Sequence, residues 1–184
     1  RHAGQGERLC SRLAGSGNLV EDGRAVDALR GVSRRFIPHL PTKDFAFRFE
    51  VVNDASVNAF AAPGGLVVVH TGLLAKATSV DDLAGVLSHE IVHATRRHSL
   101  RQIIYDLGLT TTISWVFSIP EGASVTIPGA AMNLSELKFS RDQESEAHAG
   151  GVELLEKAKL PAGGLQSIFA MLARETADIP AFLS

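Results

Sequence analysis

The pentapeptide His89-Glu90-Ile91-Val92-His93 constrains this chain more than any other feature, because two histidines four residues apart share a face only on an α-helix. At about 100° per residue, His93 lies ~40° from His89, and Glu90 lies ~60° beyond His93. The two imidazoles can therefore meet one metal ion, while the Glu90 carboxylate addresses a water molecule there without binding the ion. The alternative is a surface helix that carries these residues by chance, because so short a motif also arises at random.

The residues around this motif have the pattern of a helix with two different faces. Asp81 and Asp82 place negative charge where a helix N-terminus favours it. The apolar residues lie ~120° to 200° away from His89, on a predicted core face: Leu83, Leu87, Ile91 and Ala94. Gly85, one turn before His89, is predicted to lie on the ligand face and to leave room there for substrate or metal.

Length and composition limit the classes of protein and of metal site. The chain has 184 residues, which suits a single domain over residues 1–184. Its net charge of -2 excludes nucleic acid as an expected partner. Cys10 is the only cysteine, so ligands must be nitrogen and oxygen atoms. The chain begins with Arg1, so we expect a targeting segment to be missing, and we expect a truncated C-terminus after Ser184.

Periodicity predicts strands and helices on both sides of the motif. Alternating apolar residues over 45–52 and a β-branched run over 66–70 predict two strands, with a turn at Pro63-Gly64-Gly65 between them. The other predicted elements are helices: two within residues 1–36, one restarting at 71–74, one from Ser140 to about Lys159, and one after Gly163-Gly164.

Residues 103–119 form the most apolar stretch of the chain. The stretch is interrupted by Asp106 and is slightly shorter than the roughly 18 apolar residues that a membrane helix needs. We therefore interpret it as a buried core helix. The alternative is membrane association, through this stretch or through the missing N-terminal segment.

A catalytic zinc site needs a third protein ligand and an open position. The downstream carboxylates are the candidates: Glu121, Glu144, Glu153 and Glu156. Glu144 is favoured modestly, because His148 follows one helical turn later on the same face, and Gly150-Gly151 would let that helix approach the motif helix. Glu146 points about 200° away from Glu144 and is predicted to be solvated.

Four blocks in order resemble one known family. They are Asn58-Ala59-Phe60-Ala61 with Pro63-Gly64-Gly65, Thr71-Gly72-Leu73-Leu74, the motif with Arg97-His98-Ser99, and Ser140-Arg141 with Glu144 and Glu146-Ala147. Together they cover most of residues 45–155. The chain resembles the gluzincin zinc metallopeptidases, which include HtpX, the CaaX prenyl protease, and the Oma-type and BepA-like proteases.

This resemblance implies a set of functional residues and a location. It implies one zinc ion per chain, held by His89, His93 and Glu144, with Glu90 as the catalytic base. It also implies that substrate polypeptide adds to an edge strand formed by Gly65, Leu66, Val67, Val68 and Val69. The implied function is endoproteolysis of misfolded or envelope proteins in the bacterial cell envelope, in the periplasm or anchored to a membrane.

The sequence departs from the family pattern at His148, where the pattern has an aspartate that orients a zinc-binding histidine. His148 is a candidate for that orienting role, for a fourth ligand, or for a histidine with neither role. His70, His98 and Tyr105 are weaker candidates for stabilising an oxyanion, and His98 has a structural role as its alternative.

The expected architecture is α+β and zincin-like, with a small mixed sheet packed on the motif helix and further helices around it. The expected chemistry is zinc-dependent hydrolysis of peptide bonds. The rival is a catalytically silent, chaperone-like zinc module, in which His148 closes a four-ligand site.

Overall fold

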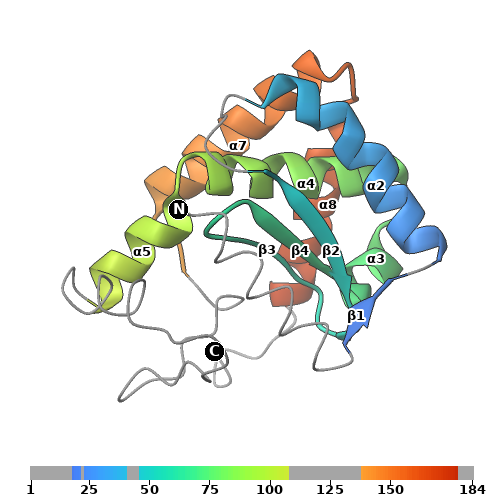
Figure 1. The fold of residues 1–184 in the computed structure, drawn as a ribbon, viewed down its shortest axis with the longest axis horizontal. Coiled ribbons are helices and arrows are strands. Elements are labelled where there is room, and N and C mark those ends of the chain that lie inside the picture. Colours follow the sequence, from blue (N-terminus) through green and yellow to red (C-terminus); the bar gives the residue numbers. More distant parts are fainter. Residues whose placement is uncertain (1–17, 22, 41–45, 108–137, 178–184) are drawn as a thin grey trace.

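The computed structural model describes residues 18–21, 23–40, 46–107 and 138–177, and it has the predicted α+β architecture (Figure 1). A small mixed sheet packs against helix α4, which also contacts α2, α5, α7 and α8. The elements follow in chain order: β1 (Leu19–Val20), α2 (Arg24–Phe36), the 3₁₀ helix η1 (Ile37–His39), β2 (Arg48–Val52), β3 (Ala59–Ala62), β4 (Leu66–His70), α3 (Thr71–Lys76), α4 (Val80–Thr95), α5 (His98–Leu107), α7 (Arg141–Lys157) and α8 (Gly163–Ala177).

The sheet has the strand order β1-β2-β4-β3. β2 runs parallel to β4, while β1 and β3 are antiparallel to their neighbours. Gly64 and Gly65 connect β3 to β4 with φ angles of 94° and 86°, a conformation that costs glycine little. The predicted strand at 66–70 is confirmed, and the strand predicted over 45–52 is found as Arg48–Val52. β1 and β3 were not predicted.

The prediction that Gly65, Leu66, Val67, Val68 and Val69 form a substrate-binding edge is wrong. Strand β4 lies between β2 and β3, so both of its edges are occupied by sheet hydrogen bonds. All five of its residues are buried, as expected for a continuous apolar run covered on both faces. Within the described part of the chain, the edge strand on this side is β3.

Helix α4 carries the HExxH motif through the centre of the structure. A capping box starts it, in which the Ser79 hydroxyl accepts from the Asp82 backbone and the Asp82 side chain accepts from the Ser79 backbone. Leu87 and Ile91 are no more than 1% exposed on the predicted core face. The ligand face is buried as well, because α7 and α8 cover it.

Gly85 makes room for a helix, and the prediction that it makes room for substrate or metal is wrong. A Cβ atom at this position would lie 2.5 Å from the Leu165 backbone nitrogen and 2.6 Å from the Leu165 Cα. Helices α4 and α8 therefore cross with their backbones almost in contact. This crossing determines where the side chains of α8 lie relative to the motif.

The remaining helices largely agree with the sequence. The helices predicted at 71–74, from Ser140 and after Gly163-Gly164 are confirmed as α3, α7 and α8. One helix predicted within residues 1–36 is found as α2, while residues 1–17 lie outside the described part. Of the apolar stretch 103–119, only residues up to 107 are described, at the end of α5. None of the described helices has the length and apolar character needed to cross a membrane.

Candidate metal centre

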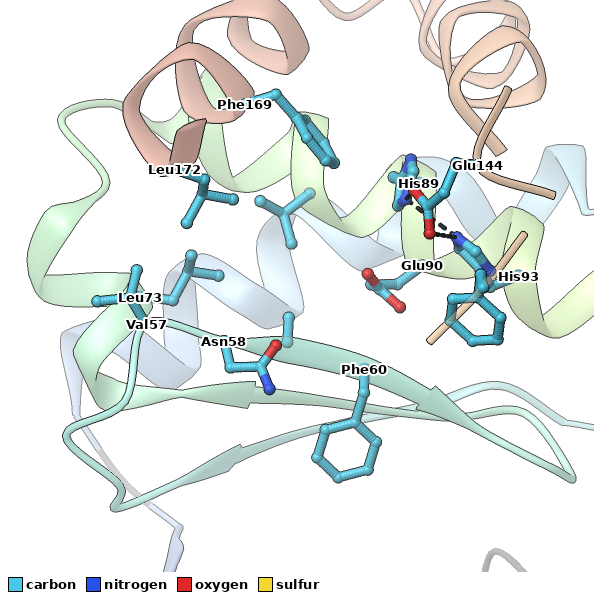
Figure 2. A pocket seen from close by; sticks show the side chains of 13 residues that line it. Val57, Asn58, Phe60, Leu73, His89, Glu90, His93, Glu144, Phe169 and Leu172 are labelled. Carbon is cyan, nitrogen blue, oxygen red and sulfur yellow. Dashed lines mark hydrogen bonds and ion pairs between the residues drawn. The ribbon is translucent and has the colours of Figure 1, made fainter. Parts of the chain in front are cut away.

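Three side chains from two helices converge on one point beside α4 (Figure 2). The Nε2 atoms of His89 and His93 are 3.0 Å apart. Glu144, from the first turn of α7, places Oε2 3.3 Å from His89 Nε2 and Oε1 3.8 Å from His93 Nε2. The two histidines are 3% and 1% exposed, while the Glu144 side chain is 45% exposed, so the cluster is buried on the side of α4 and open to solvent on the side of Glu144.

This geometry fits a zinc ion. Tetrahedral bonds of about 2.0–2.1 Å place neighbouring donor atoms about 3.3 Å apart. The two imidazole nitrogens are 3.0 Å apart, and His89 Nε2 is 3.3 Å from Glu144 Oε2, so both distances are close to this value. Two imidazole nitrogens and one carboxylate oxygen are also donors that zinc prefers. Among the residues that the structure describes, this is the one group of three or more histidine, cysteine or acidic side chains that could hold a metal.

Helix α7 brings Glu144 to the motif by close packing on α4. Its start is fixed by a capping box between Ser140 and Gln143. Further along, a Cβ at Gly151 would lie 3.1 Å from the Ser88 hydroxyl and 3.4 Å from the His89 nitrogen. The prediction that Gly150-Gly151 lets the two helices approach is therefore confirmed.

Glu90 lies beside this cluster and lines a cavity of about 210 Å³ (Figure 2). Burial of its carboxyl group, together with the nearby negative charge of Glu144, raises the pKa of Glu90 to about 8. A hydrogen bond from the Ala61 backbone of β3 acts in the opposite direction, because it stabilises the charged form. Glu90 is thus held between the sheet edge and the candidate metal ligands.

Apart from Glu90 and the three candidate ligands, the cavity is mostly apolar and comes from elements on every side of the site. Its lining includes residues that the sequence analysis did not assign to the site: Val57, Asn58, Ala59, Phe60, Leu73, Val86, Phe139, Phe169 and Leu172. Of these residues, only Asn58, Ala59, Phe60 and Leu73 belong to the sequence blocks that resemble the known family. Phe169 and Leu172 carried no sequence signal, because only the α4–α8 crossing brings them here.

His148 lies next to the cluster but outside the group of three ligands. Its ring packs edge-on against His89, with ring centroids 5.5 Å apart, and also against Phe169 at 4.7 Å. The described residues therefore do not close a four-ligand site through His148. The buried Nδ1 of His89 has no hydrogen-bond partner among the described residues, so the orienting role of His148 stays a prediction.

The other candidates that the structure describes lie away from the cavity lining. His70 packs against Phe60 and its Nδ1 is 2.7 Å from the Ser56 hydroxyl, while Tyr105 is 85% exposed. His98 is fully buried and contacts His93, so it is not placed to receive substrate. Of the rival carboxylates, Glu153 pairs with Lys157, Glu156 is exposed, and Glu121 lies outside the described residues.

The histidines predict an acid-sensitive metal-free protein. Burial lowers the pKa of His70, His93, His98 and His148, so the unfolded chain binds more protons below about pH 6.5. The raised pKa of Glu90 acts with the opposite sign in this range, so the Glu90→Gln variant removes this opposing contribution. We expect its free energy of unfolding, measured by urea titration with a chelator present, to fall from pH 7 to pH 5. A constant value would contradict these shifts.

The fold and the site together define a class. An HExxH helix, a glutamate from a second helix and a cavity beside an edge strand are the arrangement of a zincin-type metallopeptidase. A family comparison agrees with this class, since the model of peptidase family M48 matches residues 28–184. The chain belongs to peptidase family M48.

Proteins similar in sequence to this chain are named as proteases. The chain is 27% identical over 164 residues to the beta-barrel assembly-enhancing protease of Escherichia coli, covering 83% of this chain and 34% of that protein. It is 33% identical over 132 residues to the mitochondrial metalloendopeptidase OMA1 of Schizosaccharomyces pombe, covering 69% of this chain and 38% of that protein. The chain thus spans about a third of the length of these relatives.

Proposed function

We propose that this chain is a zinc-dependent metalloendopeptidase that hydrolyses peptide bonds of polypeptides. His89, His93 and Glu144 would hold one zinc ion, and Glu90 would act as the catalytic base. The observation that carries the proposal is the convergence of three ligand atoms within 4.8 Å of one another beside the Glu90 carboxyl group and its cavity.

Each residue has a role that follows from its position. A bound zinc ion supplies Lewis-acid chemistry, because it polarises a carbonyl group and makes water more acidic. Glu90 takes a proton from the attacking water and passes it to the leaving amine. The Ala61 backbone holds the Glu90 carboxylate toward the cavity. The apolar side chains of the lining offer a surface for substrate side chains next to the reacting atoms.

The substrate strand is reassigned from β4 to β3. The His70 nitrogen donates to the Asn58 carbonyl, so by alternation the backbone groups of Ala59 and Ala61 face away from β4. The Ala61 carbonyl accepts from the Ser99 hydroxyl, and the Ala61 nitrogen donates to Glu90. Ala59, which lines the cavity, is therefore the position at which an extended peptide would pair with β3.

Misfolded or envelope proteins in a bacterial cell envelope are the proposed substrates. The support is the name of the Escherichia coli relative, a beta-barrel assembly-enhancing protease. The Schizosaccharomyces pombe relative is named as a mitochondrial enzyme, so the names point to two compartments. Membrane association through the apolar stretch at 103–119 or an N-terminal segment belongs to the same proposal.

Metal removal tests the proposed function. A chelator is expected to abolish cleavage of an unfolded polypeptide, and added zinc is expected to restore it with one ion per chain. Glu144→Ala should lower zinc affinity by more than about 100-fold, because loss of a partner that only orients a ligand already costs 10–100-fold. Glu153→Ala, which changes an exposed glutamate on the same helix, is the matched control and should bind zinc normally.

The same experiment distinguishes the metalloendopeptidase from the rival function, a zinc-binding module without catalytic activity. A zinc module without activity would bind one ion per chain and cleave nothing. Zinc binding that survives Glu144→Ala would instead show that the third ligand is another residue. Either result would overturn the corresponding part of the proposal.

A further inference from the structure

A chain of polar contacts runs from His93 away from the metal-facing side of its ring. His93 Nδ1 lies 3.1 Å from His98 Nδ1, and His98 Nε2 lies 3.1 Å from Glu146 Oε2. The other carboxylate oxygen of Glu146 lies 3.2 Å from Arg96 Nε. The contacts join the end of α4, the start of α5 and the first turns of α7.

The local backbone explains why His98 reaches His93. Helix α4 ends at Thr95, and Arg97 adopts a left-handed conformation with φ 57° before α5 begins at His98. This turn changes the chain direction within two residues, and the His98 side chain that follows it is completely buried. A left-handed non-glycine residue is uncommon and costs about 1–2 kcal/mol, so the surrounding contacts hold this turn in place.

Hydrogen-bond chemistry gives the contacts a direction. The Glu146 carboxylate can only accept, so His98 Nε2 carries the proton and donates to it. A neutral His98 then has a bare Nδ1, which accepts from His93 Nδ1–H. His93 therefore has its proton on Nδ1 and an unprotonated Nε2. That is the nitrogen 3.0 Å from His89 Nε2, on the side of the candidate metal site.

We propose that His98 and Glu146 are positioning residues that fix the tautomer and ring orientation of His93 for metal binding. This inference rests on the zinc site of the proposed function. It adds a partner to Glu146, which was expected to be solvated, and for His98 it takes up the structural role that was the alternative to oxyanion support. Glu146 is 39% exposed at its side chain, but it is bonded to both His98 and Arg96.

The contrast with His89 supports this assignment. His89 Nδ1 is buried without a hydrogen-bond partner among the described residues, so nothing described there orients its proton. His93 is the candidate ligand whose second ring nitrogen has a described partner. Partners of this kind change metal affinity by about 10–100-fold in zinc proteins.

Zinc affinity and a spectroscopic signature test the proposal. Glu146→Leu removes the acceptor for His98, Glu146→Gln keeps an oxygen acceptor without the charge, and His98→Phe removes both ring nitrogens. Glu153→Leu is the control, because Glu153 is on the same helix and also loses an ion pair. Each variant is titrated with zinc by competition with a chromogenic chelator, and its metal-free stability is measured by urea unfolding. In the cobalt-substituted protein, the shifted exchangeable proton of His93 Nδ1 is followed by NMR.

We expect Glu146→Leu and His98→Phe to weaken zinc binding by about 10–100-fold, with Glu146→Gln and Glu153→Leu close to the native affinity. The His93 proton signal should persist in Glu146→Gln and disappear by exchange in His98→Phe. Native affinity in Glu146→Leu with only a loss of stability would overturn the positioning role while leaving the zinc site intact. A native chain that binds no zinc would overturn the proposed function and this inference together.

Discussion

Glu90→Gln is expected to leave one zinc ion bound per chain and to lower peptide hydrolysis by about 10²–10⁴-fold, the range that general acid–base groups contribute. Glutamine has the same shape, and its amide oxygen can still accept from the Ala61 backbone. It cannot take a proton from water or pass one to the leaving amine. Zinc content by mass spectrometry and initial rates on an unfolded polypeptide measure the two effects separately.

The control for this variant is Glu156→Gln, the same substitution at an exposed position of α7. It should change neither zinc content nor rate. Undiminished hydrolysis by Glu90→Gln would remove Glu90 from the role of base. Loss of zinc would show instead that Glu90 acts on the metal site itself.

The parts of the site that lie on one helix could be predicted from the sequence. A helix repeats every 3.6 residues, so the spacing of His89 and His93 already places both rings on one face. Local signals also mark where the helices begin, with Asp81 and Asp82 in the first turn of α4 and Ser140 as the cap of α7. The third ligand, Glu144, could not be predicted from spacing alone, which favoured it only modestly. The family resemblance was needed to assign it.

The identity of the edge strand could not be predicted in the same way. Strand β3 has only four residues, Ala59–Ala62, and three of them are alanine, which carries a weak strand signal. Strand β4 has the stronger signal, but a continuous apolar run is typical of a strand buried in the middle of a sheet. The strand with the stronger sequence pattern, β4, therefore lies in the middle of the sheet, while the short strand β3 forms the edge near Glu90.

Glu146 shows why an argument from one helix is incomplete. Its angle from Glu144 on α7 is correctly large, and on that basis solvent was the expected neighbour. Another element, the turn at Arg97, brings His98 to that side of α7. Helical phase gives the direction of a side chain, but the partner comes from tertiary packing.

Gly85→Ala is expected to destabilise the metal-free protein by about 1–3 kcal/mol or more, the cost of overpacking a tight contact. The added Cβ would lie 2.5 Å from a backbone nitrogen of Leu165, and a backbone cannot rotate away as a side chain can. Helices α4 and α8 must therefore separate. The free energy of unfolding from urea titration measures this cost.

Gly31→Ala is the matched control, because it changes an exposed glycine inside α2 where nothing lies within 4 Å of the new Cβ. Alanine is favoured over glycine in a helix by roughly 0.5–1 kcal/mol, so this variant should gain stability. The two variants thus shift stability in opposite directions although the chemical change is identical. Because α8 carries Phe169 and Leu172 into the cavity, Gly85→Ala should also raise KM for an unfolded substrate. Equal stability of the two variants would contradict the close crossing of α4 and α8.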